Sequence, residues 1–250
     1  MTQELLDTEE VAIPDISDLV IEDDAPIDNF QSEKQQRLLV EPLYSSRVLP
    51  TPFIAAANVA VFYAIKQDPV VPDAFLSLGV QMPTDWSQKQ NRSYFVWEFG
   101  KTPEVAIEVV SNKVGKELGF KKDKYARIGV AYYAVFDPLK QIQAPEQMNG
   151  ALLRVYGLTQ GKYVELEQPW LETVGLGLTL WEGEFEDQPG LWLRWCDQDG
   201  QVISTGKERA DAVASQLEEE RRQKEEERRQ KEKLLERLRS MGVEIDPEQL

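Results

Sequence analysis

The feature that most limits the fold is a pair of apolar runs joined by a helical segment. Residues 104–110 (EVAIEVV) and 131–137 (AYYAVFD) have the length and the β-branched or aromatic content of buried strands. Residues 113–129 lie between them and repeat apolar side chains at the spacing of an amphipathic helix. Two strands joined by a helix usually run parallel in one sheet, so the sequence predicts an α/β fold.

Apolar runs on both sides of this unit extend the expected sheet. Residues 58–65 (NVAVFYAI) and 74–80 (AFLSLGV) precede it. Four segments separated by turns with Gly, Pro or Asp follow it and are typical of antiparallel strands: LLRVYGL, KYVELE, LGLTLWEGEFE and GLWLRWCD. We expect their tryptophans to pack in the core rather than to form a binding platform: Trp170, Trp181, Trp192 and Trp195.

A first helix is expected to begin at Ser32, because Ser32 and Gln35 have the spacing of a capping box. Leu38, Leu39 and Leu43 follow and form a helical stripe. The expected architecture is therefore a mixed central sheet flanked by helices, with additional antiparallel strands and a charged helix at the C-terminus.

Charge divides the chain into three segments. The net charge is −16, and residues 1–29 contain ten acidic side chains and no basic one. A stretch of uniform charge without apolar periodicity repels itself, so we expect a flexible acidic arm there. Residues 30–206 are only mildly acidic and form the expected folded domain, and residues 207–250 form the expected charged C-terminal helix.

The C-terminal segment contains the unit EEERRQK twice in succession. In four places an acid stands four positions before a base, the favourable order for a helix: Glu218–Arg222, Glu220–Lys224, Glu225–Arg229 and Glu227–Lys231. Residues 218–233 contain no apolar side chain, which does not fit an ordinary coiled-coil seam. A solvated charged helix is one interpretation. The other is a homodimer with coiled-coil contacts through the flanking apolar residues: Val213, Leu217, Leu234, Leu235 and Leu238.

The composition excludes several kinds of chemistry. The chain has no histidine, which rules out serine–histidine triads and zinc sites built on histidine. Cys196 is the only cysteine, which rules out an internal disulfide. The sequence has no apolar run of roughly 18 residues and no secretory signal pattern, so we expect a cytoplasmic protein without a membrane partner.

Glu108 is an acid in the middle of an apolar run. Side chains alternate along a strand, so Ala106, Glu108 and Val110 are expected to share one face. Strands of crossover units are usually covered on both faces, where an ionised carboxylate is costly unless it is paired or bound to metal. Glu108 is therefore either a satisfied structural acid, a group at a strand end open to solvent, or a functional residue.

Asp73 follows Pro72 at the start of the run 74–80. A Pro-Asp pair is a common turn opener, which is the simpler interpretation. Two carboxylates from neighbouring strands are also the usual way to hold Mg²⁺, which prefers oxygen ligands. Asp73 and Glu108 together therefore predict a metal site.

Lys121 lies on the apolar face of the expected helix. At about 100° per residue, it falls in the stripe formed by Leu118, Tyr125 and Ile128. A lysine on a buried face is rarely left unpaired, and this one is close enough along the chain to return to Glu108. The pair is either a structural salt bridge or part of a catalytic site. The other lysines of the segment lie off the centre of the stripe: Lys116, Lys122 and Lys124.

The order of these motifs resembles a known family. VPD at 71–73 is followed by EVAIEVV after Pro103, by a lysine four residues before YARIGV, and by an aromatic strand that ends in Asp137-Pro138. Over roughly residues 30–185 this pattern is similar to the Uma-type branch of restriction endonucleases, within the PD-(D/E)XK nuclease superfamily. The resemblance implies a restriction-endonuclease-like α/β fold.

The resemblance also implies roles for individual residues. Asp73 and Glu108 would be metal ligands, with the Val109 carbonyl as a third, and Glu33 on the first helix would be an accessory acid. The usual lysine two residues after the second acid is absent, because Val110 stands there. In this branch the lysine is displaced onto the following helix, which again points to Lys121 as the catalytic cation.

The implied activity is Mg²⁺- or Mn²⁺-dependent hydrolysis of phosphodiester bonds in nucleic acid, with DNA as the expected partner. A negative net charge opposes this activity, because lysine and arginine contacts drive phosphate binding. One alternative is a catalytically silent nuclease fold that serves as a binding or scaffold protein. Another is a metal-dependent hydrolase that acts on a small phosphorylated molecule.

Overall fold

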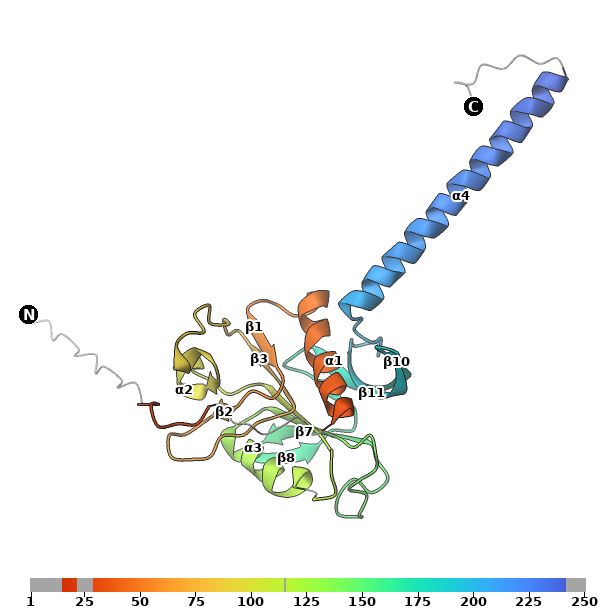
Figure 1. Cartoon of the computed structure of the whole chain (residues 1–250). Helices are drawn as coiled ribbons and strands as arrows, with labels where there is room; N and C mark the ends of the chain where they lie inside the picture. The colour runs from red at the N-terminus through yellow and green to blue at the C-terminus, as the bar shows by residue number, and fades with distance from the viewer. Residues whose placement is uncertain (1–14, 22–28, 115, 242–250) are drawn as a thin grey trace, which may run out of the picture. The chain divides into compact units, whose positions relative to one another are not determined.

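The computed structural model describes residues 15–21, 29–114 and 116–241 (Figure 1). These residues form two compact units, which divide between Ile203 and Ser204. The acidic arm expected at residues 1–29 falls mostly outside the described residues, and the boundaries of the three segments remain predictions. None of the helices in the described ranges is both long and apolar enough to cross a bilayer.

The first unit is built on a six-stranded sheet in the order β1-β3-β5-β6-β7-β8. β5 and β6 pair in parallel, and the other neighbours pair antiparallel, which confirms the mixed sheet. The strands are β1 (Phe53–Ala56), β3 (Ala74–Leu78), β5 (Val105–Val109), β6 (Tyr132–Phe136), β7 (Leu153–Thr159) and β8 (Lys162–Glu165).

The crossover between β5 and β6 is shorter than the sequence suggests. A π-helical turn (η2, Glu117–Lys121) leads into α3 (Lys122–Ile128), so regular helix covers only part of residues 113–129. α3 ends at Gly129, which has a φ of 91° that residues with a Cβ rarely adopt. The strand–helix–strand unit is confirmed, and its helical segment begins with a widened turn rather than an α-helical one.

The two faces of β5 belong to two different apolar cores. Val105, Ile107 and Val109 lie in the core on the side of α1 (Phe30–Ser46). The other core contains the second set of alternating side chains together with residues of α3 and β6: Ala106, Val110, Tyr125 and Tyr133. Glu108 has the same parity as Ala106 and Val110, so its side chain enters the core beneath α3.

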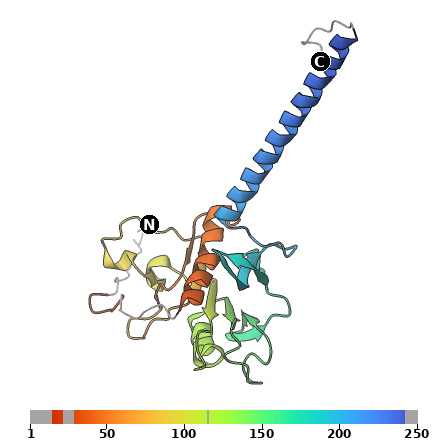
Figure 2. The same cartoon turned by 45° about the vertical axis from the view of Figure 1, so that its right-hand side comes forward.

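Helix α1 packs against β1, β3 and β11 (Figures 1 and 2). The expected start at Ser32 is wrong, because Asn29 caps the helix by accepting a hydrogen bond from the Ser32 backbone N–H at 2.9 Å. Gln35 takes no part in a capping box. Its amide bonds the backbone N–H and C=O of Leu193 at 2.9 and 2.8 Å and ties α1 to β11.

The first unit also contains elements outside the six-stranded sheet. A three-stranded antiparallel sheet contains β9 (Trp170–Leu171), β10 (Leu176–Phe185) and β11 (Gln188–Cys196). The strand expected at 58–65 is reduced to β2 (Val61–Phe62), which pairs in parallel with β4 (Tyr94–Phe95). The described part of the unit also contains a 3₁₀ turn, η1 (Lys89–Asn91), and a short helix, α2 (Val96–Phe99).

The second unit is the expected charged helix, α4 (Gly206–Ser240). Thr205 and Glu208 form a reciprocal capping box at its start, with bonds of 3.1 and 2.7 Å. The side chains of residues 210–234 are exposed, which agrees with a solvated helix. The expected Glu225–Arg229 pair is present at 3.7 Å. Other pairs differ from the expected ones: Glu219 and Arg222 are three residues apart, and in Arg228–Glu232 the base precedes the acid by four.

Candidate active site

Glu108 is held between a lysine and a tyrosine from the crossover. Its side chain is 2% exposed, although it carries a carboxylate. Lys121 Nζ lies 2.7 Å from Glu108 Oε2, and the Tyr125 hydroxyl donates a hydrogen bond of 2.8 Å to Glu108 Oε1. Lys121 and Tyr125 stand four residues apart, so one turn of helix brings both donors to the same carboxylate.

Burial controls the protonation of this group. It raises the pKa of Glu108 to about 7, and the positive charge of Lys121 offsets only part of that effect. Burial alone would lower the pKa of Lys121, but the neighbouring carboxylates outweigh it and keep the ammonium charged. Burial also raises the pKa of Tyr125 well above its ordinary value, so its hydroxyl keeps the proton that it donates. Glu108 therefore lies where an additional positive charge would stabilise its ionised form.

Asp73 lies beside the end of β5. The pairing of β3 with β5 ends at Ala74 opposite Ile107, and Pro72 has no backbone N–H with which to extend it. The Asp73 carboxylate occupies this gap in the ladder: Oδ2 accepts a hydrogen bond of 2.7 Å from the Val109 N–H. The Pro-Asp pair thus places a second carboxylate next to the residue that follows Glu108.

Two amides continue this contact toward α1. Gln36 Nε2 donates a hydrogen bond of 2.8 Å to Asp73 Oδ1, and Asn58 Nδ2 donates one of 3.0 Å to Gln36 Oε1. Gln36 is only 4% exposed. Both oxygens of Asp73 are therefore oriented by the protein, one by helix α1 and one by β5.

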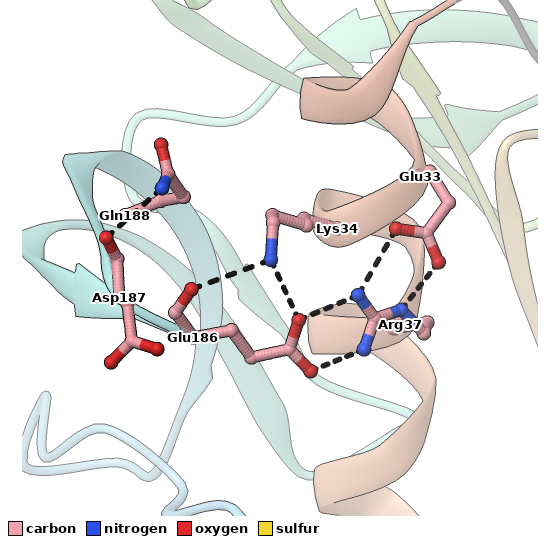
Figure 3. Close-up of polar contacts among 6 residues, drawn as sticks. All are labelled: Glu33, Lys34, Arg37, Glu186, Asp187 and Gln188. Carbon is pink, nitrogen blue, oxygen red and sulfur yellow. Dashed lines mark hydrogen bonds and ion pairs between the residues drawn. The ribbon is translucent and has the colours of Figure 1, made fainter.

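Glu33 lies elsewhere on α1 (Figure 3). Its carboxylate binds Arg37 at 2.5 and 3.0 Å, and Arg37 in turn binds Glu186 in the turn between β10 and β11. Gln36 is the residue of α1 that contacts Asp73. The structure thus brings together Asp73, Glu108, Val109 and Lys121, and it places Glu33 in a separate charged cluster.

The donor set suits a hard cation. Asp73 and Glu108 supply carboxylate oxygens from neighbouring strands, and the Val109 carbonyl belongs to the same strand end. Burial and, to a lesser degree, repulsion from Asp73 raise the pKa of Glu108, so a cation beside both acids would favour its ionised form. Among residues 15–21, 29–114 and 116–241, no cluster of three or more acidic or cysteine side chains could hold a metal ion. A cation at this place would therefore depend on backbone and water oxygens besides the two acids.

Comparisons with known proteins identify the family of the chain. A family model described as "Uma2: Putative restriction endonuclease" matches residues 4–182. The chain belongs to the Uma2 family. The match begins well before α1, so it includes most of the acidic stretch that the resemblance left out. No curated protein matches this Uma2 chain.

One solved structure is similar to part of this Uma2 protein. It is described as "a putative nuclease belonging to DUF820 from Anabaena variabilis", with 14% sequence identity and a TM-score of 0.39. The similarity covers 58% of this chain and 71% of the other one. A likeness of this size places none of the residues described above.

Sequence reasoning missed two polar members of the site. Tyr125 was expected only as part of an apolar stripe, and its position four residues after Lys121 was the available signal. Gln36 lies on the buried face of α1, three residues before Leu39 and seven before Leu43, where an amide was a sign of a buried partner. Neither side chain is charged at neutral pH, so neither stands out within an apolar pattern as Glu108 and Lys121 do.

Proposed function

We propose that the chain is a Mg²⁺-dependent endonuclease that hydrolyses phosphodiester bonds in DNA. The observation that carries this proposal is the 2.7 Å hydrogen bond from the Val109 N–H to Asp73 Oδ2. It fixes one carboxylate beside the strand that carries Glu108, in a place where β3 no longer pairs with β5. The description of the Uma2 family as restriction endonucleases supports DNA as the substrate.

In this proposal Asp73, Glu108 and the Val109 carbonyl hold the metal ion. A bound Mg²⁺ would polarise the phosphoryl oxygens and lower the pKa of a coordinated water. Lys121 orients the attacking water and stabilises the negative charge that develops on the phosphorus centre. Its side chain is 37% exposed, so part of it reaches solvent while the ammonium is anchored at Glu108.

The other residues orient these groups. Tyr125 fixes the second oxygen of Glu108, and Gln36 fixes Asp73 from the side of α1. Fixed carboxylates bind a cation with less loss of side-chain freedom, because their rotamers are already set. We assign no role in this chemistry to Glu33, since its carboxylate is bound by Arg37.

A second candidate is a catalytically silent nuclease fold that binds or scaffolds a partner. The observation that favours it is that each carboxylate oxygen of Glu108 already accepts a hydrogen bond, one from Lys121 and the other from Tyr125. In that case the ion pair with Lys121 is structural, and no cation competes for the carboxylate.

Cleavage of supercoiled plasmid DNA separates the two candidates. The wild-type protein should nick or linearise the plasmid in Mg²⁺ or Mn²⁺, and a chelator should stop the reaction. Asp73→Asn and Glu108→Gln keep the side-chain shape and remove the charge, so both should lose at least about 100-fold in rate. Glu172→Gln changes an exposed acid and serves as the control. A folded wild-type protein without metal-dependent cleavage would support the silent fold.

A further inference from the structure

Glu117 is a buried acid to which the proposed function gives no role. It is 8% exposed, and its Oε2 atom has no hydrogen-bond partner among the described residues. Its other oxygen, Oε1, lies 3.9 Å from Lys121 Nζ, which is beyond hydrogen-bond distance. A buried carboxylate oxygen without a donor is costly, so this one calls for an explanation.

The backbone holds Glu117 in this place. The Tyr133 hydroxyl donates a hydrogen bond of 2.8 Å to the Glu117 carbonyl. At the other end of the π-helical turn, the Lys121 N–H donates to the Lys116 carbonyl at 3.0 Å. Gly119, between these two bonds, has φ −112° and ψ −106°, which are not helical values. Turns of this kind occur often at functional sites, and this one keeps Glu117 and Lys121 close to each other.

Lys121 thus lies between two buried carboxylates and contacts them unequally. It bonds Glu108 at 2.7 Å and approaches Glu117 only to 3.9 Å. An ammonium group has three N–H donors, so it can change its principal partner by a small rotation of the side chain. A divalent cation on Glu108 would repel the ammonium from that carboxylate, because both are positive.

We propose that Glu117 is a positioning residue that takes Lys121 over from Glu108 when a divalent cation binds to Glu108; this inference rests on the proposed function. The Glu117 carboxylate is the acceptor held ready for that exchange, since its Oε1 is the oxygen nearer the ammonium and its Oε2 has no donor among the described residues. The exchange keeps Lys121 charged and within reach of the substrate. It also lowers the cost of cation binding, since the displaced ammonium moves to another carboxylate instead of remaining unpaired.

The test is a double-mutant cycle on Mn²⁺ affinity, measured by calorimetry on the full chain without DNA. Glu117→Gln keeps the shape of the side chain and removes its charge, and it should weaken Mn²⁺ binding about tenfold. In the background of Lys121→Met, the same substitution should have almost no effect, because no ammonium then needs a new partner. Asp123→Asn removes an exposed acid of the same helical segment and should change the affinity little in either background.

The outcomes separate this inference from the function on which it rests. An equal loss of affinity from Glu117→Gln in both backgrounds would make Glu117 a direct ligand or a general electrostatic group, and would overturn the inference. An unchanged affinity in Glu117→Gln would also overturn it, while cation binding by the wild-type protein would still stand. A wild-type protein that binds no Mn²⁺ would overturn the metal-dependent function and the inference with it. In the absence of metal, Glu117→Gln should not lower the free energy of unfolding measured in urea. Substitution of a purely structural acid would lower it.

Discussion

Tyr125 donates its hydroxyl hydrogen to the oxygen of Glu108 that Lys121 does not bind, at 2.8 Å. The carboxylate is thus held at both oxygens by two residues from consecutive turns of one helical segment. This explains how an acid can occupy a face of β5 that otherwise contains only apolar side chains. It also fixes the orientation of the Glu108 carboxylate, whose ionised form the negative charge of Asp73 disfavours.

Removal of the Tyr125 hydroxyl should cost more stability than removal of an ordinary tyrosine hydroxyl. Tyr125→Phe leaves a buried carboxylate oxygen without a donor, so we expect the free energy of unfolding to fall by about 1.5–3 kcal/mol. Tyr163→Phe is the matched control, because Tyr163 donates at the same 2.8 Å to a neutral acceptor, the Val130 carbonyl. Urea unfolding of both variants is the measurement. An equal or larger loss in the control would show that the charge of Glu108 adds nothing to this bond.

Gln35 and Gln36 are neighbours on α1 with different expected roles. Gln36→Leu removes the donor to Asp73 Oδ1 and should weaken Mn²⁺ binding by about 10-fold or more, as is usual for groups that orient metal ligands. Gln35→Leu removes two bonds to the backbone of Leu193 and should lower the stability of the fold without a change in Mn²⁺ affinity. Calorimetric titration and urea unfolding of the two variants test this division. A larger loss of Mn²⁺ affinity in Gln35→Leu would contradict it.

Glu186 should make the stability depend on pH in the acid range. Hydrogen bonds from Arg37 and Lys34 lower the pKa of Glu186 from 4.5 to about 2 in the folded protein (Figure 3). A carboxyl whose pKa is lowered on folding stabilises the fold fully above its unfolded pKa, and loses that contribution as the pH falls through the folded pKa. We therefore expect part of the stability to disappear between pH 4.5 and about 2.

Thermal unfolding over that pH range is the measurement. Glu186→Gln should flatten the dependence on pH, and the effect should be small because the side chain is 36% exposed to solvent. Glu184→Gln, an exposed acid on β10, is the control and should leave the wild-type dependence unchanged. The assignment fails if the two variants show the same profile.

The charged helix α4 should contribute little to the stability of the first unit. Truncation of the chain before Lys207 deletes helix α4, whose side chains from residue 210 to residue 234 are exposed. We expect the midpoint of thermal unfolding of the remaining unit to change by no more than a degree or two, since exposed ion pairs are worth only about 0.3–0.5 kcal/mol each. Differential scanning calorimetry of both chains is the measurement. A large drop in the shortened chain would show that α4 supports the fold.

The sequence predicted the parts of the fold that follow from local periodicity. β5, α3 and β6 were recognisable because each has one clear pattern of apolar side chains, and their connection limits the pairing to a parallel one. The alternation around Glu108 likewise predicted which side chains share its face. Strands of two residues, such as β2 and β4, are too short to show a pattern, and their pairing depends on the chain around them.

The candidate site was predictable only in its charged members. Lys121 and Glu108 stand out as charges within apolar patterns, because an unpaired charge there would be costly. The π-helical turn leaves no such signal, since Gly119 alone does not distinguish it from an α-helical turn. The contacts of Gln36 depend on how α1 packs on β3, which is a tertiary relationship between residues 37 positions apart.

The role of Lys121 is the central claim, and the rate of Mg²⁺-dependent DNA cleavage by Lys121→Met tests it most directly. Methionine keeps the length and the apolar part of the side chain and removes the charge. We expect the cleavage rate to fall by at least about 100-fold. Lys124→Met, whose lysine bonds the backbone carbonyls of Asp68 and Pro69 at 2.8 and 3.2 Å, should cleave at close to the wild-type rate. Cleavage at the wild-type rate by Lys121→Met would contradict the proposed role of Lys121.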